Sequence, residues 1–123
     1  MHRICLKEKS LLRSLSDQVT DETFLVVHPP PRGVCDQAGN RVSAGSRNLR
    51  TFIEKAQPRV VLCGHIHEQA GAGMIKKSLV VNCAMNKNCW GAILEVEKEG
   101  QPRVNFLHPG ELGDMESQPD NQP

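Results

Sequence analysis

Three histidines follow two apolar stretches of the sequence. His28 comes directly after residues 23–27, and His65 and His67 come after residues 59–63, in the order Gly-His-Ile-His-Glu. Imidazole is a common ligand for zinc, iron, manganese and nickel in proteins. Each histidine alone is equally well interpreted as a capping or surface residue. The agreement of three positions, each just after a predicted strand, favours a metal site.

The two apolar stretches are predicted to be parallel strands of one sheet. Residues 23–27 form a short run of β-forming side chains, which suits a strand buried on both faces, and residues 59–63 have the same character. Between them, Ser46 is a candidate N-cap for a helix that ends before Pro58. One face of this helix is apolar: Leu49, Phe52, Ile53 and Ala56. Parallel strands in a strand–helix–strand unit have their carboxyl ends at one rim of the sheet, where ligands bind.

The rest of the chain is predicted to contain one more helix and three more strands. The helix lies at residues 7–15, and the strands lie at residues 78–82, 90–97 and 103–107, with a hairpin-like turn between the last two. Residues 29–45 form a long loop, which in a compact domain is usually functional or disordered. The predicted organisation is a helical segment at residues 1–19, a partial domain at residues 20–107 and a disordered tail at residues 108–123.

Composition excludes several classes of function. The 123 residues carry 15 Lys and Arg against 14 Asp and Glu, so a nucleic-acid grip built on positive charge is not expected. The mean hydropathy is −0.42, and no apolar run approaches the roughly 20 residues that a membrane-spanning helix needs. The first nine residues lack the apolar core of a secretory signal. The five cysteines form no CxxC pair, so we expect reduced thiols and a cytoplasmic location.

Three blocks of the sequence, in this order along the chain, resemble the calcineurin-like metallophosphoesterases. Residues 26–36 carry the pattern HxPPxGxxD, residues 45–50 form a second block, and residues 57–68 end in GHIHE. The similarity is to the compact subgroup with these motifs, and it covers about residues 20–107. The resemblance implies an α/β fold, specifically the C-terminal part of a two-sheet α/β/β/α sandwich with a two-metal site at its rim.

The resemblance assigns roles to the three histidines. It implies that His28 and His65 bind one divalent metal and that His67 binds the other, the metals being manganese, iron or zinc. In such a site, two metals about 3.5–4 Å apart clamp a phosphate and lower the pKa of a bridging water, which becomes the nucleophile. The implied substrate is a small phosphate monoester or diester.

The same motifs contain residues that would support the site. Gly33 and Asp36 belong to the loop pattern, where shaping the loop is the favoured role and contact with substrate the alternative. Gly64 precedes His65 and leaves room for a sharp turn. Glu68 is expected to orient that turn or a ligand histidine from the second layer around the metal.

The family motifs that should precede His28 are absent. The family carries Asp-x-His, Gly-Asp-x-x-Asp and Gly-Asn-His-Asp/Glu blocks, which supply a bridging aspartate, an asparagine ligand and a catalytic histidine; no catalytic residue is therefore identified here. The chain resembles the C-terminal half of such an enzyme, as a fragment, a truncated gene product or a remnant. We expect little turnover from it alone, and association through an exposed sheet edge.

Two other interpretations of the histidines remain open. In the first, His28, His65 and His67 hold a single zinc with an open fourth position. In the second, the chain is a non-catalytic remnant that acts only through its exposed sheet edge.

Four further residues near these motifs are interpreted as structural. Cys63 is expected to be a core thiol, and Asn82, at the end of a strand near the rim, a turn cap with a possible role in the site. Arg47 and Arg50 would attract phosphate, although solvated positions on a helix are the favoured interpretation.

Overall fold

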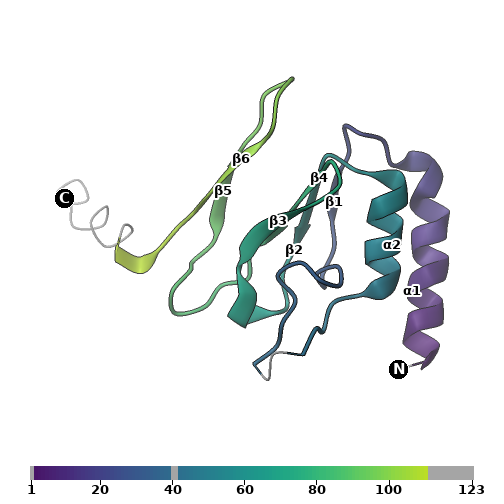
Figure 1. The fold of residues 1–123 in the computed structure, drawn as a ribbon, viewed down its shortest axis with the longest axis horizontal. Coiled ribbons are helices and arrows are strands. Elements are labelled where there is room, and N and C mark those ends of the chain that lie inside the picture. The colour runs from purple at the N-terminus through teal and green to yellow at the C-terminus, as the bar shows by residue number, and fades with distance from the viewer. Residues whose placement is uncertain (1, 40–41, 111–123) are drawn as a thin grey trace, which may run out of the picture.

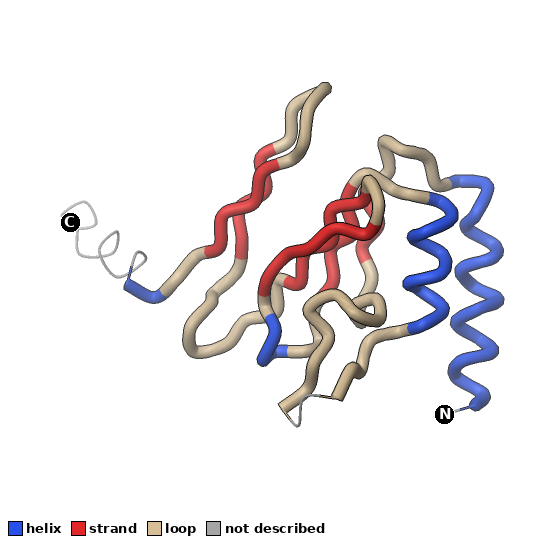
Figure 2. Tube along the Cα trace, in the orientation of Figure 1, coloured by secondary structure: helices blue, strands red, loops and turns tan. Residues whose placement is uncertain are grey.

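Two helices, a four-stranded sheet and a two-stranded hairpin form three successive layers in the computed structural model (Figure 1). The structure describes residues 2–39 and 42–110. In chain order the elements are α1 (His2–Leu15), η1 (Ser16–Gln18), β1 (Phe24–Val26), α2 (Arg47–Ala56), β2 (Val60–Cys63), η2 (His67–Gln69), β3 (Gly71–Ile75), β4 (Ser78–Asn82), β5 (Ala92–Glu95) and β6 (Arg103–Phe106), as Figure 2 shows by colour. This mixed two-sheet arrangement confirms the expected fold class.

The strand order in the larger sheet is β1-β2-β4-β3. β1 is parallel to β2 and β2 is parallel to β4, whereas β3 is antiparallel to β4. The predicted strand–helix–strand unit is therefore confirmed, with α2 connecting two adjacent parallel strands. Because β1, β2 and β4 point the same way, their carboxyl ends share one rim of the sheet.

Strand β3 was not expected from the sequence, because glycine and alanine are unfavourable in strands. The loop of residues 29–45 explains these small residues, since it packs against β3. A Cβ atom on Gly73 would lie 2.9 Å from Cγ1 of Val34, and one on Gly71 would lie 3.3 Å from the sulfur of Cys35. The strand needs glycine where another segment approaches its backbone.

Helix α2 forms as the sequence predicts. The hydroxyl of Ser46 accepts a hydrogen bond from the amide of Leu49 at 3.0 Å, which caps the first turn. Gln57 ends the helix in the left-handed conformation, one residue before Pro58. The side chains of Leu49 and Ile53 are buried against the sheet together with Leu25, Val61 and Val80 from the strands.

The opposite face of the sheet is covered only in part. The strand register puts Phe24 of β1 on the same face as the buried residues Val60 and Leu79, and the β5–β6 hairpin lies on the side of the sheet opposite the helices (Figure 1). Phe24 is 40% exposed and Val26 is 73% exposed. The prediction that residues 23–27 are buried on both faces is therefore wrong, because β1 lies at the sheet edge and the hairpin does not reach it.

Contacts from the hairpin fix it to the far end of the sheet. Arg59, just before β2, donates hydrogen bonds to the carbonyls of Glu97 and Gly100 in the turn between β5 and β6. The amide of Gln101 lies 3.5 Å from the sulfur of Met74 on β3. The hairpin predicted from the sequence is thus confirmed, and it serves as a short second sheet.

Two further sequence predictions concern the C-terminal tail and membrane-spanning helices. The predicted disordered tail, residues 108–123, falls mostly outside the described residues. Among the residues that the structure describes, no helix has the length and apolar character that crossing a membrane requires.

The uneven burial of β1 and β2 makes a testable prediction. Val61→Ala removes two methyl groups from a fully buried site and should lower the free energy of unfolding by about 2 kcal/mol. Val26→Ala makes the same chemical change at an exposed site and should cost less than about 0.5 kcal/mol. Urea unfolding followed by circular dichroism measures both values; equal losses would contradict the exposed position of β1.

Candidate metal centre

Main-chain hydrogen bonds extend the sheet beyond its strands and bring two histidines together. The amide of Gly64 donates to the carbonyl of His28 at 2.9 Å, and the amide of Cys83 donates to the carbonyl of Cys63 at 3.0 Å. The segments that follow β1, β2 and β4 are therefore still in register where the strands end. His28 and His65 are held at adjacent positions on the rim.

The imidazole rings of His28 and His65 are in direct contact. Nε2 of His28 lies 3.0 Å from Nδ1 of His65, and the ring centroids are 4.7 Å apart. This is the distance of a hydrogen bond between the two rings, in which one nitrogen donates and the other accepts. Two nitrogens at this separation would also subtend an angle of about 90° at a metal with bonds of about 2.1 Å, the angle between neighbouring ligands of an octahedral ion. Both rings are exposed to solvent. The distance suits either a hydrogen bond between the rings or two ligands of one metal.

His65 occupies a strained turn. Its φ angle is +70°, and the amide of Ile66 donates to the carbonyl of Gly64 at 2.8 Å, which closes a γ-turn around the histidine. A non-glycine residue in this conformation costs of order 1–3 kcal/mol and is concentrated at functional sites. The turn directs the ring of His65 toward His28, away from the path of an extended strand.

Gly64 was expected to leave room for a sharp turn before His65, and the structure has that turn centred on the next residue. Gly64 has no positive φ, and a Cβ atom there would lie 4.0 Å from the Cβ of Ala84, an ordinary contact. The left-handed residue is His65 itself. Sequence patterns place a glycine near the turn but do not say which residue of the turn bends.

His67 is oriented separately from the pair. Its Nδ1 lies 2.8 Å from the carbonyl oxygen of Met85, so Nδ1 carries the proton and donates it. In the neutral ring, Nε2 then has the free lone pair that a metal ligand requires. The side chain of Asn86 donates to the carbonyl of His67 at 2.5 Å and holds the η2 turn. Neither Met85 nor Asn86 was identified from the sequence, because both act on His67 from a loop eighteen or more residues away.

The carboxylate of Asp36 shapes the loop that follows His28. Asp36 is 2% exposed, and its Oδ2 accepts hydrogen bonds from the amides of Gly33 at 2.9 Å and Gly45 at 3.0 Å. Gly33 has a φ of +91°, and a Cβ atom there would lie 2.9 Å from Nη1 of Arg50. Asp36 and Gly33 thus have the structural role that the sequence analysis favoured.

Asn82 is a buried polar residue that hydrogen-bonds to three segments at the rim of the sheet. It is fully buried at the end of β4, and its Nδ2 donates to the carbonyls of Cys35 and Ile66, each at 3.0 Å. Its Oδ1 accepts from the amide of Ala84 at 3.0 Å. The side chain therefore joins the loop after β1, the turn that carries His65 and the segment after β4. Its position at a strand end was the only sequence signal for this role.

Glu68 does not contact the ligand histidines. Its side chain is exposed, and its Oε2 would lie 3.3 Å from a Cβ atom on Gly39 of the loop. Within residues 2–39 and 42–110, no hydrogen bond joins Glu68 to His65 or His67. The expected orienting role of Glu68 stays a prediction that this arrangement does not support.

The thiols beneath the rim are protonated core groups. Burial, reinforced by the nearby thiols of Cys35 and Cys83, raises the pKa of Cys63 to about 12. Burial also raises the pKa of Cys35, with the Asp36 carboxylate as the second cause. Metals bind the thiolate form, so these cysteines are poor additional ligands for a metal held by the histidines.

The described residues contain no complete set of metal ligands. No group of three or more His, Cys, Asp and Glu side chains that could hold a metal occurs within them. The single-zinc alternative requires His28, His65 and His67 in one group, and their arrangement does not support it. A pair at one position and a separate, oriented His67 match the division between two metals that the family resemblance implies, although the ligand assignment stays a prediction.

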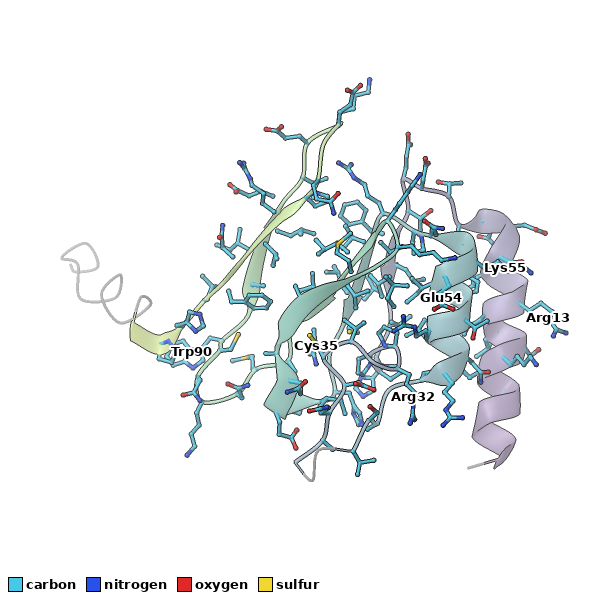
Figure 3. All side chains as sticks on the ribbon, viewed as in Figure 1. Arg13, Arg32, Cys35, Glu54, Lys55 and Trp90 are labelled. Atoms are coloured by element: carbon cyan, nitrogen blue, oxygen red, sulfur yellow. The ribbon has the colours of Figure 1, made fainter. Side chains whose placement is uncertain are left out.

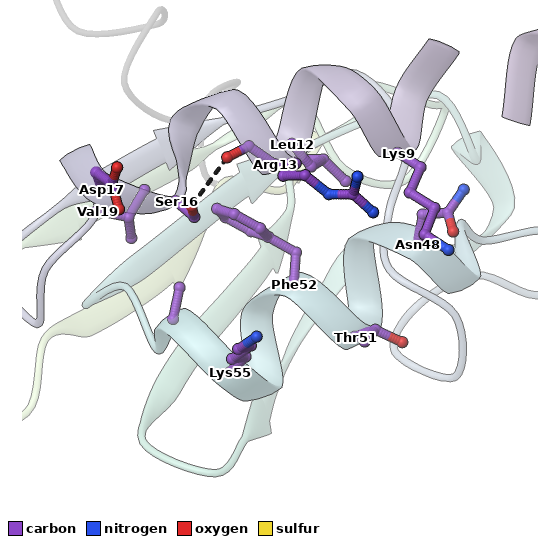
Figure 4. Close-up of a pocket in the computed structure, with 11 residues that line it drawn as sticks. Lys9, Leu12, Arg13, Ser16, Asp17, Val19, Asn48, Thr51, Phe52 and Lys55 are labelled. Atoms are coloured by element: carbon purple, nitrogen blue, oxygen red, sulfur yellow. Dashed lines mark hydrogen bonds between the residues drawn. The ribbon is translucent and has the colours of Figure 1, made fainter. Parts of the chain in front are cut away.

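A groove between the two helices lies apart from the histidines. It has a volume of about 710 Å³, and Figure 4 shows Phe52 and Leu12 between the basic side chains of Lys9, Arg13 and Lys55. Its walls come from α1, η1 and α2, on the side of the sheet that the helices cover (Figure 1). None of the histidines lines it, so the groove does not belong to the candidate metal centre.

Comparisons with known proteins identify a family and a relative. A family model described as metallophosphoesterase, calcineurin superfamily, matches residues 8–102. The chain is also 36% identical over 64 residues to UPF0046 protein K07C11.7 of Caenorhabditis elegans, an alignment that takes in 52% of this chain and 22% of the worm protein. The chain therefore spans less than a quarter of that relative. No solved structure matches it.

The hydrogen bonds of Asn82 predict a large loss of stability on truncation. Asn82→Ala leaves the carbonyls of Cys35 and Ile66 buried with one partner fewer, and should lower the free energy of unfolding by about 3 kcal/mol. Asn105→Ala, at an exposed position on β6, is the matched control and should cost less than about 0.5 kcal/mol. Similar urea midpoints for the two variants would contradict the connecting role of Asn82.

The strained turn predicts that two substitutions of His65 differ in stability. Both His65→Gly and His65→Ala remove the ring, but only glycine adopts a positive φ without steric cost. We expect His65→Gly to be more stable than His65→Ala by about 1 kcal/mol in metal-free buffer. Thermal unfolding measures the difference, and an alanine variant at least as stable as the glycine variant would show that residue 65 is unstrained.

Proposed function

This chain belongs to the calcineurin superfamily of metallophosphoesterases, and we propose that it contributes the histidine half of a two-metal centre that hydrolyses phosphate esters. The observation that carries the proposal is the contact between Nε2 of His28 and Nδ1 of His65 at 3.0 Å. The two nitrogens belong to different loops and meet only because the sheet register continues past the strand ends. The rings hydrogen-bond to each other in the structure, and in the proposed centre a metal replaces that hydrogen bond.

The residues of this chain have distinct tasks in the proposed centre. His28 and His65 hold one metal, and His67 presents Nε2 to the other while Nδ1 donates to the carbonyl of Met85. When bound, the two metals supply the positive charge that polarises a phosphate ester and activates water. Asp36 and Asn82 keep the surrounding loops in place through buried hydrogen bonds.

The proposed centre needs carboxylate and amide ligands from another part of the domain. Hard divalent metals favour oxygen ligands, and the described residues bring none of their carboxylates into a group with the histidines. The chain spans only 22% of the worm relative, so the relative has ample sequence outside the match. We propose that a strand-bearing segment with these ligands, in the same longer polypeptide or in a separate chain, completes the site.

Strand β1 is the proposed docking position for that segment. In its ladder with β2, the carbonyl of Thr23 and the amide of Val27 are bonded inward, so the alternate residues Phe24 and Val26 direct their main-chain groups to the open edge. Their side chains are also exposed, at 40% and 73%. Main-chain groups and apolar surface are both available at one edge, which is what strand addition uses.

The proposed substrate is a small phosphoester, and the proposed location is the cytoplasm. The free thiols of Cys35, Cys63, Cys83 and Cys89 support a reducing compartment. The alternative of a non-catalytic remnant shares the open edge of β1 but requires no metal at His28 and His65.

Metal titration tests the ligand assignment. Isothermal titration of the chain with zinc should show binding that His65→Ala and His28→Ala each weaken about tenfold or more, because one of two paired ligands is lost. His108→Ala, which changes a histidine outside the motifs, should bind like the parent chain. Equal affinity in all four proteins would contradict the assignment and favour the remnant.

Phosphatase assays test whether the chain needs a second segment with metal ligands for turnover. The chain alone should hydrolyse an aryl phosphate with little turnover in manganese or zinc, since the described residues group no carboxylates with the histidines. Addition of a segment with the upstream Asp-x-His and Gly-Asn-His-Asp/Glu blocks should raise turnover, and His65→Ala should abolish the gain. Robust turnover by the chain alone, unaffected by His65→Ala, would contradict the proposal.

A further inference from the structure

Three arginines meet in a small pocket beside the loop of residues 29–45. The pocket has a volume of about 300 Å³ and is lined by Arg32, Arg47, Arg50, Thr51 and Glu54. Arg32 comes from the loop that follows His28, and the other four residues lie on the first two turns of α2. Figure 3 labels Arg32 beside α2, below Glu54.

Arg50 is fixed in place and orders one wall of the pocket. Its Nε donates to the carboxylate of Glu54 at 3.0 Å, and its Nη1 donates to the carbonyl of Arg32 at 3.0 Å. Gly33 provides the space, since a Cβ atom there would lie 2.9 Å from the same Nη1. The Arg50 guanidinium thus draws Arg32 against the helix and keeps the loop next to α2.

Arg32 and Arg47 have no carboxylate partner among the described residues. The ion pairs found there are Arg50 with Glu54 and Arg103 with Glu95. Nη1 of Arg32 has one weak contact, 3.5 Å from the carbonyl of Ser43. The pocket therefore gathers three positive charges against one negative charge. Like charges in one pocket repel each other, and a bound anion removes the repulsion.

We propose that this pocket binds a phosphate group. Guanidinium groups present planar pairs of N–H donors that match the oxygens of phosphate and form short, charge-assisted hydrogen bonds. Arg32 and Arg47 supply these donors, Thr51 adds a hydroxyl, and Arg50 keeps the two segments together. A doubly charged oxyanion balances the excess charge of the pocket.

The pocket is separate from the histidines but lies at the same end of the sheet. α2 runs opposite to β1 and β2, so its amino end, with Arg47, is on the rim side (Figure 1). The prolines at 29–31 are the residues between His28 and Arg32. If the proposed function holds, the pocket receives a second anionic group of the substrate. The binding of phosphate itself does not depend on that function or on a metal.

Binding of pyrophosphate to the metal-free chain tests the inference. Isothermal titration in buffer with a chelator and constant chloride should show binding, which Arg32→Gln/Arg47→Gln should weaken by about tenfold or more. The control Lys98→Gln/Arg103→Gln removes the same charge from the β5–β6 hairpin and should bind within about twofold of the parent. Thermal unfolding of each variant verifies that the fold is kept.

Two results would overturn the inference. One is no binding by the parent chain, and the other is an equal loss in the two double variants, which would assign the effect to overall charge. Because no metal is present, failure here leaves the histidine centre untouched. Failure of zinc binding by His28 and His65 would likewise leave the arginine pocket untouched.

Discussion

One buried amide side chain connects the segments on which the candidate centre depends. Asn82 ends the central strand β4 and donates to carbonyls in two loops that are far apart in sequence, one containing Cys35 and the other Ile66. Loops rich in proline, glycine and polar residues have few apolar contacts of their own. A fully buried hydrogen-bond donor fixes them to the sheet, because losing it would leave each of those carbonyls with one hydrogen-bond partner fewer. Exposed histidines are then held by a rigid base.

A second buried polar group does the same for the loop after His28. Asp36 gathers the amides of Gly33 and Gly45, and Arg50 fixes the carbonyl of Arg32 from the helix side. These contacts convert a segment that sequence rules leave as functional or disordered into an ordered wall of the rim. The strain at His65 is acceptable in this setting, because the surrounding hydrogen bonds determine the turn.

Incomplete packing and incomplete chemistry occur at the same edge of the molecule. β1 exposes Phe24 and Val26 where the hairpin stops, and within the described part of the chain no carboxylates are grouped with the histidines at the end of β1. The proposed docking segment would account for both observations with a single cause. The family membership and the short coverage of the worm relative support this interpretation.

Local patterns predicted much of this arrangement, and longer-range contacts account for the rest. The apolar face of α2, its Ser46 cap and the parallel strands before His28 and His65 follow from spacing and strand composition. The burial of β1 was wrong because burial depends on what covers a strand. Likewise, β3 was missed because its glycines are required by the loop that packs on it, a contact that the local sequence does not reveal. The grouping of Arg32 with Arg47 could not be predicted either, because it requires the loop to fold back on α2.

The most direct test of the histidine arrangement is an anomalous difference map from crystals of this chain soaked in zinc. A peak should lie between Nε2 of His28 and Nδ1 of His65, and any zinc at His67 should be a separate peak on its Nε2 side. A single zinc held by all three histidines would contradict the division into two positions. Saturating zinc with no peak at His28 and His65 would show that the pair is not a metal site.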